Sequence, residues 1–527
     1  MSTSTTACSV VPGPTTIAGS SWKSYAWFAL CTALYILPFM RTMMVGTDEG
    51  TLDYGAIRIL HGDTFGRDFF EVIGPGTFYW LAGFFKIFGV SFFATRVSLF
   101  ITSLGTALMI YFLSRRICGS NRTLPVIMLA ATSFGGLWPA ISHHDDSNFF
   151  ALMSIACMSL WIVKGRKSLL FGAGVLAGAT TTFLQPKGIL LVATLAAFIV
   201  LQRRTRSDVM RSIAVLTVGY SCVVAVVLTY FWSRDALHDL IYVNVTWPSQ
   251  HYGSVNAVPY AHGILSNYWD HWVSARDQFP WTVALAIVMF VPVLCVAGLP
   301  VLLPIVGARF RWNITEPQVV LLWLTGFAIW ISELHRTDMT HLIFGSPVLM
   351  ILLVHFITGY AGKIAAAALQ LITISSVCLG GFNLLLQTAA HTVSTRVGAV
   401  RMFKDAEAIS FVQSIIPAGI EIFAYPYAPR YYFLTGTVNP TRYSLLTYNY
   451  NTTDQFNEVL SILERNRVEY VVWDIEFQQI EGMVFLGPKP STDQQIIEPY
   501  LLSHYQLIRL VDGKRIMRRR ADIDERH

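Results

Sequence analysis

Long apolar segments dominate the first 390 residues and constrain the fold of this chain more than any other feature. The segments are predominantly apolar and 15 to 27 residues long, close to the roughly 17 to 25 that an α-helix needs to cross the hydrocarbon core of a bilayer. We place them at 24–42, 92–113, 124–141, 148–163, 168–184, 188–202, 210–231, 280–306, 317–332, 341–360 and 364–389. Only 13% of the residues are charged, against roughly 25% in an average soluble domain. The sequence therefore predicts a polytopic α-helical membrane protein with about eleven transmembrane helices.

The charges in the loops predict the orientation of these helices. Alternate loops carry the strings SRRICGSNR, KGRK, QRRTRSD, GARFRW and GK, which are almost purely basic. Such loops stay in the cytoplasm, so residues 1–23 form a cytoplasmic tail. The acidic residues gather in the other loops, which we place outside the membrane at 43–91, 142–147, 232–279 and 333–340. The net charge of +6 thus reports membrane orientation and not a nucleic-acid partner.

Two regions outside the predicted spans have a pattern of their own. The stretch GPGTFYWLAGFFKIFG is apolar but short and rich in glycine, so we interpret it as an interfacial or re-entrant helix. Residues 391–527 alternate amphipathic helices with β-branched strands and end in two strands around an Asp-Gly turn, which is a strong hairpin signal. Because the number of predicted spans is odd, this α/β accessory domain is expected to be extracytoplasmic.

The loop after the first apolar segment begins with the acidic string GTDEGTLDYG. Thr47 is in a position to cap a helix whose first turn holds Asp48 and Glu49. The apolar residues that follow fall on one face, so we expect this helix to lie on the membrane surface. Two interpretations are open at this point: the acids complement the helix dipole, or they belong to an active site.

The sequence from this loop onward is similar to a known enzyme family. Asp48 and Glu49 after the first span, the strings RDFFE and GPGTFYWL, and a long span that ends in Ser-Arg-Arg resemble the GT-C membrane glycosyltransferases, in particular the dolichyl-phosphate-mannose protein mannosyltransferase and aminoarabinose transferase group. The resemblance implies a GT-C fold in a bacterial inner membrane and a polyprenyl-phosphate sugar donor. It also implies transfer to a lipid, glycan or protein on the extracytoplasmic face, with Asp48 in catalysis and Glu49 beside it.

A sugar on a polyprenyl phosphate already has a good leaving group, so the reaction needs two kinds of side chain. A carboxylate must take the proton of the acceptor hydroxyl, and cations must hold the departing phosphate. Asp48 suits the first role, as the general base of an inverting transfer. The phosphate-binding candidates are Lys187, Arg336 and Arg67, and the alternative for each is a cation that extends to lipid headgroups. Ile73 stands where relatives often have a lysine, so one expected phosphate contact is missing.

A second external cluster lies in the string SHHDDSNFF. Its members are His143, His144, Asp145 and Asp146. They are suited to positioning the acceptor, and Asp145 and Asp146 are also suited to a divalent metal cation, since carboxylate oxygens are hard ligands. The plain alternative is a solvated loop that caps the next helix through Asp146 or Ser147. An additional polar group surrounds Arg336 and consists of His335, Asp338 and His341.

Two other functions fit a polytopic chain of this kind. A transporter or flippase would use carboxylates and histidines to relay protons or bind a solute, and it should place charges near the bilayer midplane. The predicted spans are nearly free of Asp and Glu, which favours an interfacial active site. A non-catalytic member of the same fold is the third possibility, and Ile73 is its only indication.

Overall fold

The computed structural model describes most of the chain. The described residues are 22–43, 48–118, 140–202, 205–252, 258, 260–261, 296–308, 316–360, 364–365, 367–368, 370–371, 392–402, 404–448, 450–479 and 494–521. The predicted spans at 124–141, 280–306 and 364–389 lie largely outside these residues. The total number of transmembrane helices therefore stays a prediction.

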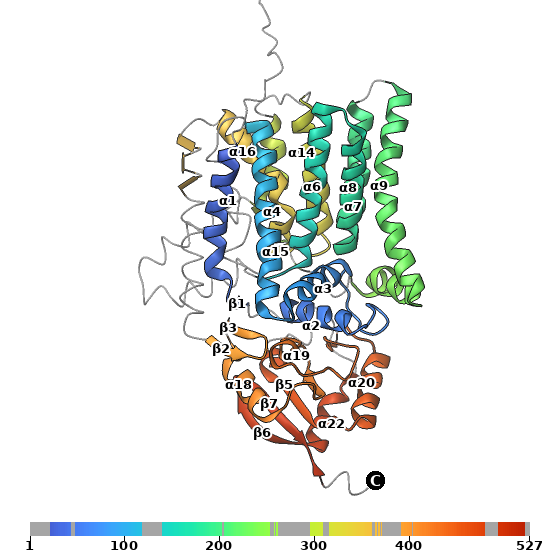
Figure 1. Ribbon diagram of the computed structural model, residues 1–527, viewed down its shortest axis with the longest axis vertical. Helices are drawn as coiled ribbons and strands as arrows, with labels where there is room; N and C mark the ends of the chain where they lie inside the picture. The colour runs from blue at the N-terminus through green and yellow to red at the C-terminus, as the bar shows by residue number, and fades with distance from the viewer. Residues whose placement is uncertain are drawn as a thin grey trace, which may run out of the picture.

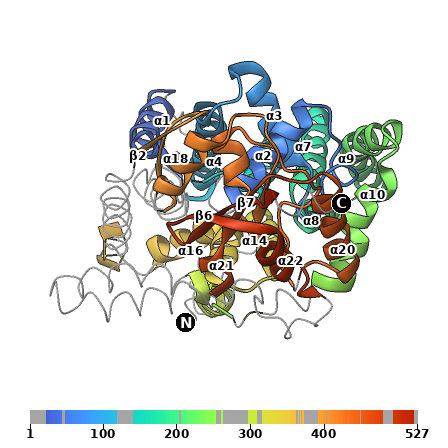
Figure 2. The same ribbon diagram turned by 90° about the horizontal axis from the view of Figure 1, so that it is seen from below.

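A bundle of helices forms the upper part of the molecule (Figure 1). Its described members are α1 (Trp22–Ile36), α4 (Phe92–Cys118), α6 (His143–Lys164), α7 (Lys167–Phe183), α8 (Gln185–Gln202), α9 (Arg206–Ser233), a helix at Val296–Ala308, α14 (Pro317–Glu333) and α16 (Pro347–Tyr360). By length and composition, α4, α6, α8 and α9 are each able to cross a membrane. Figure 2 shows α1 and α9 on opposite sides of this bundle.

Small residues allow neighbouring helices of the bundle to pack closely. A Cβ atom on Gly174 of α7 would lie 2.1 Å from the carbonyl oxygen of Leu216, and one on Gly219 of α9 would lie 2.3 Å from that of Phe171. Close backbone contact of this kind is common between membrane helices. The turn from α6 to α7 uses Gly165 at a φ of 64°, a conformation that glycine adopts without strain.

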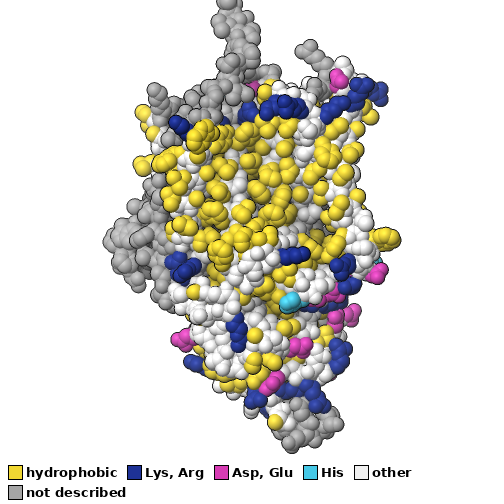
Figure 3. All heavy atoms as spheres, viewed as in Figure 1, with side chains coloured by type: hydrophobic (Ala, Val, Ile, Leu, Met, Phe, Trp, Pro, Cys, Tyr) yellow, Lys and Arg dark blue, Asp and Glu magenta, His cyan; other side chains and the backbone are white. Residues whose placement is uncertain are grey.

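Basic residues gather at one end of the bundle. Those at helix ends on the upper side are Arg115, Arg116, Lys164, Lys167 and Arg206. Figure 3 shows Lys and Arg along the upper edge of the apolar band, whereas both charge types lie below it, with most of the visible Asp and Glu. Which of these ends faces the cytoplasm stays a prediction.

Short helices lie across the lower end of the bundle. α2 (Asp48–Leu60) and α3 (Gly76–Phe88) pack on each other between the spans and the C-terminal domain (Figure 1). Both helices lie across the end of the spans and not alongside them. The sequence predicts this position for both. Thr47, the predicted cap of α2, lies outside the described residues. The segment after α9 adds the short elements α10 (Leu237–Ile241), η2 (Tyr242–Thr246) and η3 (Pro248–Tyr252).

The C-terminal domain lies below these helices and is built on two sheets. The first has the strand order β1-β3-β2, and its members are β1 (Thr42–Met43), β2 (Thr392–Thr395) and β3 (Gly398–Met402). The second has the order β4-β5-β7-β6, and its members are β4 (Ile422–Tyr425), β5 (Tyr470–Asp474), β6 (Tyr505–Val511) and β7 (Lys514–Arg519). The helices of the domain are α18 (Ala406–Ile415), α19 (Arg430–Thr435), α20 (Thr453–Arg465), α21 (Ile475–Gln479) and α22 (Ile497–His504).

The predicted helices and strands of this domain are confirmed. β4 and β5 pair in parallel, whereas β7 pairs antiparallel with both β5 and β6. The turn between β6 and β7 consists of Asp512 and Gly513, which have φ values of 49° and 67°. A tight hairpin turn of this type requires positive φ at both central residues. The prediction of a hairpin at Asp512 and Gly513 is therefore confirmed, and the backbone angles explain why this residue pair forms it.

One apolar core joins α2 and α3 to the C-terminal domain. The ring of Tyr54 in α2 lies 4.8 Å from that of Tyr432 in α19, and Phe85 in α3 stacks on Phe433 at 6.0 Å. Gly50 of α2 approaches α19 so closely that a Cβ atom there would lie 2.5 Å from the backbone nitrogen of Arg430. The loop between α1 and α4 is thus fixed to the C-terminal domain as well as to the spans.

Candidate functional site

Asp48 is the first residue of α2 and its side chain is exposed. Its Oδ1 atom accepts a hydrogen bond of 2.7 Å from the hydroxyl group of Tyr427, which belongs to the C-terminal domain. Among the described residues, Tyr427 is the one hydrogen-bond partner of this carboxylate. Asp48 therefore combines access with a fixed orientation, as a general base requires.

Glu49 is buried beside it and has a different environment. Its two oxygens pair with the guanidinium of Arg96 in α4 at 2.5 and 3.0 Å, and Oε1 also accepts the backbone N–H of Ile141 at 3.2 Å. The guanidinium carbon of Arg96 lies 4.3 Å above the ring of Phe92. Glu49 thus joins the start of α2 to α4 and to the residues that precede α6.

Two further carboxyl groups of the first external loop are buried near this pair. Asp53, one turn along α2, accepts a 2.7 Å hydrogen bond from Thr95, and burial and the charge of Glu49 raise the pKa of Asp53 well above its usual range. Burial also raises the pKa of Glu71 to about 8, and the charge of Asp48 adds to this effect. Burial therefore favours the neutral acid form of both groups, which lie close to the ion pair of Glu49 and Arg96.

A second polar cluster centres on Glu333 at the lower end of α14. Its Oε1 lies 2.7 Å from Nζ of Lys187, and its Oε2 lies 2.9 Å from Nδ1 of His144. The Lys187 ammonium group also donates to Ser147 at 2.9 Å and to Asn148 at 2.7 Å. Lys187 and Glu333 are both 0% exposed, so this predicted phosphate-binding lysine is enclosed by protein groups.

The predicted polar group around Arg336 borders this cluster. Nε of Arg336 lies 2.6 Å from Asp338, which also accepts the backbone N–H of His341 at 3.0 Å and contacts Nδ1 of its ring at 2.8 Å. Burial alone would raise the pKa of Asp338, but the hydrogen bonds and charge of His341 hold it well below its usual range. The ring of His335 lies 5.2 Å from that of His341 and 6.3 Å from that of His144. All these side chains are brought together.

The string SHHDDSNFF starts at the N-cap of a helix and continues into its first turns, so residues 143–147 are helical and not part of the loop predicted at 142–147. α6 begins at His143 because the side chain of Ser142, not Asp146 or Ser147, accepts the N–H of His144 at 3.2 Å and caps it. Asp146 is buried and its Oδ1 accepts a 3.2 Å hydrogen bond from Thr102.

This turn brings the two polar clusters together at one end of α6. The residues just before α6 contact Glu49, whereas His144 reaches Glu333. The rings of His143 and His144 lie 4.0 Å apart, and Asp145 is half-buried near Lys187. Within the described part of the chain, no three His, Cys, Asp or Glu side chains converge as metal ligands, Asp145 and Asp146 included.

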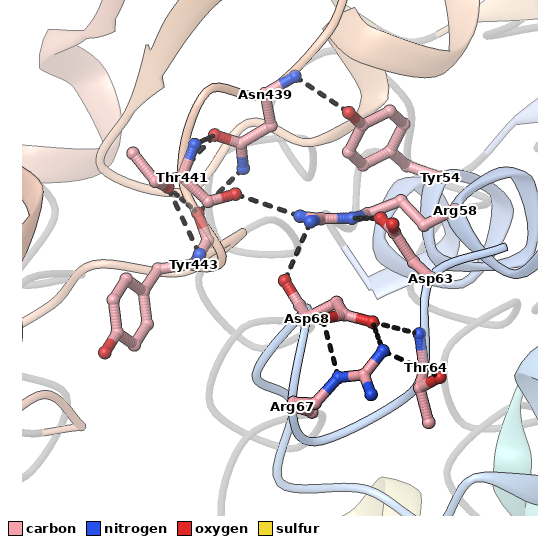
Figure 4. Close-up of polar contacts among 9 residues, drawn as sticks. All are labelled: Tyr54, Arg58, Asp63, Thr64, Arg67, Asp68, Asn439, Thr441 and Tyr443. Carbon is pink, nitrogen blue, oxygen red and sulfur yellow. Dashed lines mark hydrogen bonds and ion pairs between the residues drawn. The ribbon is translucent and has the colours of Figure 1, made fainter. Parts of the chain in front are cut away.

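Arg67 lies away from both clusters. Its guanidinium pairs with Asp68 at 2.8 Å (Figure 4). It also donates to the carbonyl oxygen of Arg234. Arg58, near the C-terminal end of α2, binds the carbonyl oxygen of Asp68 at 2.8 Å. Since Asp48 is ten residues earlier in the same helix, about 15 Å separate the two ends by helical rise. The structure does not bring Arg67 to Asp48.

Three residues of these clusters have no role in the sequence predictions. Arg96 stands inside an apolar segment, where an ionisable residue is an indication of function that the sequence does offer. Glu333 was expected only as one acid of an external loop. Tyr427 lies 379 residues from Asp48 along the chain, and no local pattern in the sequence indicates that the two residues meet.

Comparison with known proteins identifies the family to which this arrangement is similar. Residues 73–232 match the family model described as dolichyl-phosphate-mannose-protein mannosyltransferase. No curated protein sequence matches the chain. These residues include α3, α4 and the His143–Asp146 turn, which supply many of the contacts described above.

One solved structure shows the same fold, and two others align less well. ArnT from Cupriavidus metallidurans bound to undecaprenyl phosphate aligns with a TM-score of 0.55 and 12% identity, over 96% of this chain and 99% of ArnT. ArnT in the apo state gives a TM-score of 0.48 and 11% identity, over 96% of this chain and 99% of that one. The third structure is AglB from Archaeoglobus fulgidus, an archaeal oligosaccharyltransferase in complex with an inhibitory peptide and a dolichol-phosphate. It gives a TM-score of 0.49 and 11% identity, over 89% of this chain and 71% of AglB. Together with the family match, the shared ArnT fold confirms the GT-C resemblance found in the sequence.

Proposed function

We propose that this chain is a membrane glycosyltransferase. It takes a sugar from a polyprenyl-phosphate donor and transfers it, with inversion, to a lipid, glycan or protein acceptor at the extracytoplasmic face of a bacterial inner membrane. One observation carries the proposal: the exposed carboxylate of Asp48 lies between the span bundle and the external domain, in a fold shared with a structure that contains undecaprenyl phosphate.

In the proposed reaction Asp48 is the general base. The acceptor oxygen attacks the anomeric carbon while the bond from that carbon to the phosphate oxygen breaks. The electron pair of that bond leaves with the polyprenyl phosphate, and the proton of the acceptor hydroxyl passes to Asp48. A single displacement of this kind inverts the anomeric centre. Glu49 is less suited to be the base because Arg96 occupies both of its oxygens, so its proposed role is to fix the start of α2.

The departing phosphate needs cationic partners, and two are at hand. Arg336 is the more accessible, since its side chain is 22% exposed and is held by Asp338. Lys187 would contact the phosphate only after exchanging Glu333 for it, because its ammonium group is enclosed. We therefore propose that Arg336 contacts the phosphate directly. The proposed role of Lys187 is to neutralise Glu333 nearby. Arg67 has no part in this scheme.

The residues at the start of α6 are proposed to position the acceptor. Asp145 and His143 are the partly exposed members of that turn, whereas His144 and Asp146 are buried and held by protein partners. The two exposed members are suited to hydrogen bonds with sugar or acceptor hydroxyl groups. Their proposed task is orientation, and the chemistry is left to Asp48.

The test is sugar transfer by the purified protein in proteoliposomes. Undecaprenyl-phosphate-linked mannose and aminoarabinose serve as donors, and protein-free liposomes serve as the control. We expect release of undecaprenyl phosphate together with a product whose anomeric configuration, read by NMR, is opposite to that of the donor. Movement of the intact lipid-linked sugar across the bilayer, without any transfer, would contradict the proposal and indicate a flippase.

A further inference from the structure

The external domain reaches the proposed base through Tyr427, in the turn between β4 and α19. The Tyr427 hydroxyl donates to Oδ1 of Asp48 at 2.7 Å and accepts a hydrogen bond from Thr51 of α2 at 3.2 Å. Because the Thr51 hydroxyl donates a hydrogen bond to the Tyr427 oxygen, the Tyr427 hydroxyl hydrogen points to the carboxylate of Asp48. The three groups form a short chain of hydrogen bonds in one direction.

The position of this turn is set by packing on both of its sides. The ring of Tyr427 contacts the edge of Phe477 in α21, with ring centroids 5.9 Å apart. Arg430, three residues later, packs its backbone against Gly50 and forms buried ion pairs with Asp405 and Asp474 inside the domain. A hydroxyl group held in this way gives its partner one preferred orientation, because little freedom is left at either end.

We propose that Tyr427 is a positioning residue for Asp48, so that the external domain completes the active site. This inference rests on the proposed function, in which Asp48 is the base. The hydrogen bond occupies one carboxylate oxygen and leaves Oδ2 to take the acceptor proton. The carboxylate is thus held with one oxygen bound and the other turned to the substrate side.

The groups around this contact define what a pH measurement will report. Glu71 faces Tyr427 and Asp48 from the loop before α3, and burial keeps it neutral below about pH 8. Glu49 and Arg96 neutralise each other next to Asp48. Titration of Glu71 therefore affects the alkaline side of the profile.

The test compares Tyr427→Phe with Tyr54→Phe. Tyr54 is a matched control because its hydroxyl also crosses from α2 to the external domain, accepting the N–H of Asn439 at 2.7 Å, but it does not contact Asp48. With undecaprenyl-phosphate mannose and aminoarabinose as donor probes, we expect Tyr427→Phe to lower kcat on the order of 10- to 100-fold, with the KM for donor changed by less than about 2-fold. Tyr54→Phe should stay within about 3-fold of wild type.

A second measurement reads Asp48 without turnover. Carbodiimide with a small amine modifies accessible carboxyl groups, so mass spectrometry at one fixed pH gives the rate at which Asp48 is labelled, and Asp48→Asn identifies the labelled site. We expect Tyr427→Phe to raise this labelling rate, because Oδ1 of Asp48 loses its hydrogen-bond partner. Thr51→Val, which removes only the hydroxyl that orients Tyr427, should raise it by less, and it replaces Tyr427→Phe if that variant does not fold.

The outcomes separate the two proposals. An unchanged labelling rate in Tyr427→Phe, or an equal loss of kcat in Tyr54→Phe, overturns the positioning role and leaves Asp48 as the base. Wild-type transfer by Asp48→Asn removes Asp48 as the base instead, whatever the labelling shows. A raised labelling rate with a selective loss of kcat supports Tyr427 as the contribution of the external domain.

Discussion

The Asp48 region and the Glu333 region lie at the same end of the spans but treat charge in different ways. Asp48 is exposed and has a single described hydrogen-bond partner, whereas Glu333 is fully buried between Lys187 and His144. A carboxylate with one free oxygen is suited to exchange protons with a substrate. A carboxylate enclosed by cations is costly to disturb and holds helices in place. Under the proposed function, similar residue types thus divide here into a reacting group and a supporting group.

Lys187→Met should have the largest effect on stability. It leaves Glu333 buried without its ammonium partner, which costs about 3 to 5 kcal/mol when one half of a buried pair is removed. Denaturant unfolding in detergent measures the loss. The double variant Lys187→Met/Glu333→Gln should recover at least half of it, since no charge is then left unpaired. A loss below about 1 kcal/mol in the single variant would mean that the pair is not a supporting element.

Glu49→Gln should have the next largest effect. The amide keeps one hydrogen bond to Arg96 but leaves the buried guanidinium without a counter-charge, so we expect a loss of about 2 kcal/mol and a clear fall in transfer. The matched control is Asp63→Asn, since Asp63 pairs with Arg58 at 2.6 Å on the more exposed part of the same loop. Equal losses of stability and transfer in the two variants would contradict the claim that the buried Glu49–Arg96 pair matters more than the more exposed Asp63–Arg58 pair.

Glu71 should give the protein a stability that falls as the pH rises. Its pKa is about 8 in the folded state and close to its ordinary value in the unfolded state. The folded state therefore binds more protons between these values, and stability declines as the pH rises through this range. Thermal unfolding of Glu71→Gln should show a flatter pH dependence from pH 5 to 8.5, with a higher midpoint than wild type at pH 8.5. Parallel curves for the two proteins would contradict the neutral buried acid.

Arg67→Gln should have the smallest effect. Its pair with Asp68 is largely exposed, and surface pairs contribute roughly 0 to 1 kcal/mol. Transfer should stay close to wild type because Arg67 lies at the far end of α2 from Asp48. A strong rise in KM for the donor in Arg67→Gln would indicate that Arg67 binds the donor phosphate, and it would contradict the exclusion of Arg67 from the site.

The sequence predicted the architecture better than the contacts within it. Apolar length predicted membrane-crossing helices such as α4, α6, α8 and α9, and the pattern of residues 391–527 predicted the helices and the β6–β7 hairpin, because these features are local. The number of spans and their orientation stay predictions. The start of α6 was placed too late, since Ser142 caps the helix before the polar turn. Lys187 was expected to meet phosphate, and only the tertiary packing shows that Glu333 encloses it.

The least predictable part of the site is the contribution of the external domain. Asp48 was found from its place after the first span, but Tyr427 reaches it across 379 residues of sequence. Contacts at such separation depend on how α19 packs on α2, and this depends on a close approach at Gly50 that nothing in the sequence around Gly50 indicates. The residue types predict the chemistry, whereas the fold decides which groups take part.

Sugar transfer by Asp48→Asn, measured together with its thermal unfolding, tests the central claim most directly. The matched control is Asp454→Asn, an exposed carboxylate in the first turn of α20. We predict that Asp48→Asn lowers kcat by about 10²- to 10⁴-fold with undecaprenyl-phosphate mannose or aminoarabinose, while its unfolding midpoint stays near that of wild type and the control keeps full activity. Transfer at the wild-type rate by folded Asp48→Asn would contradict the account.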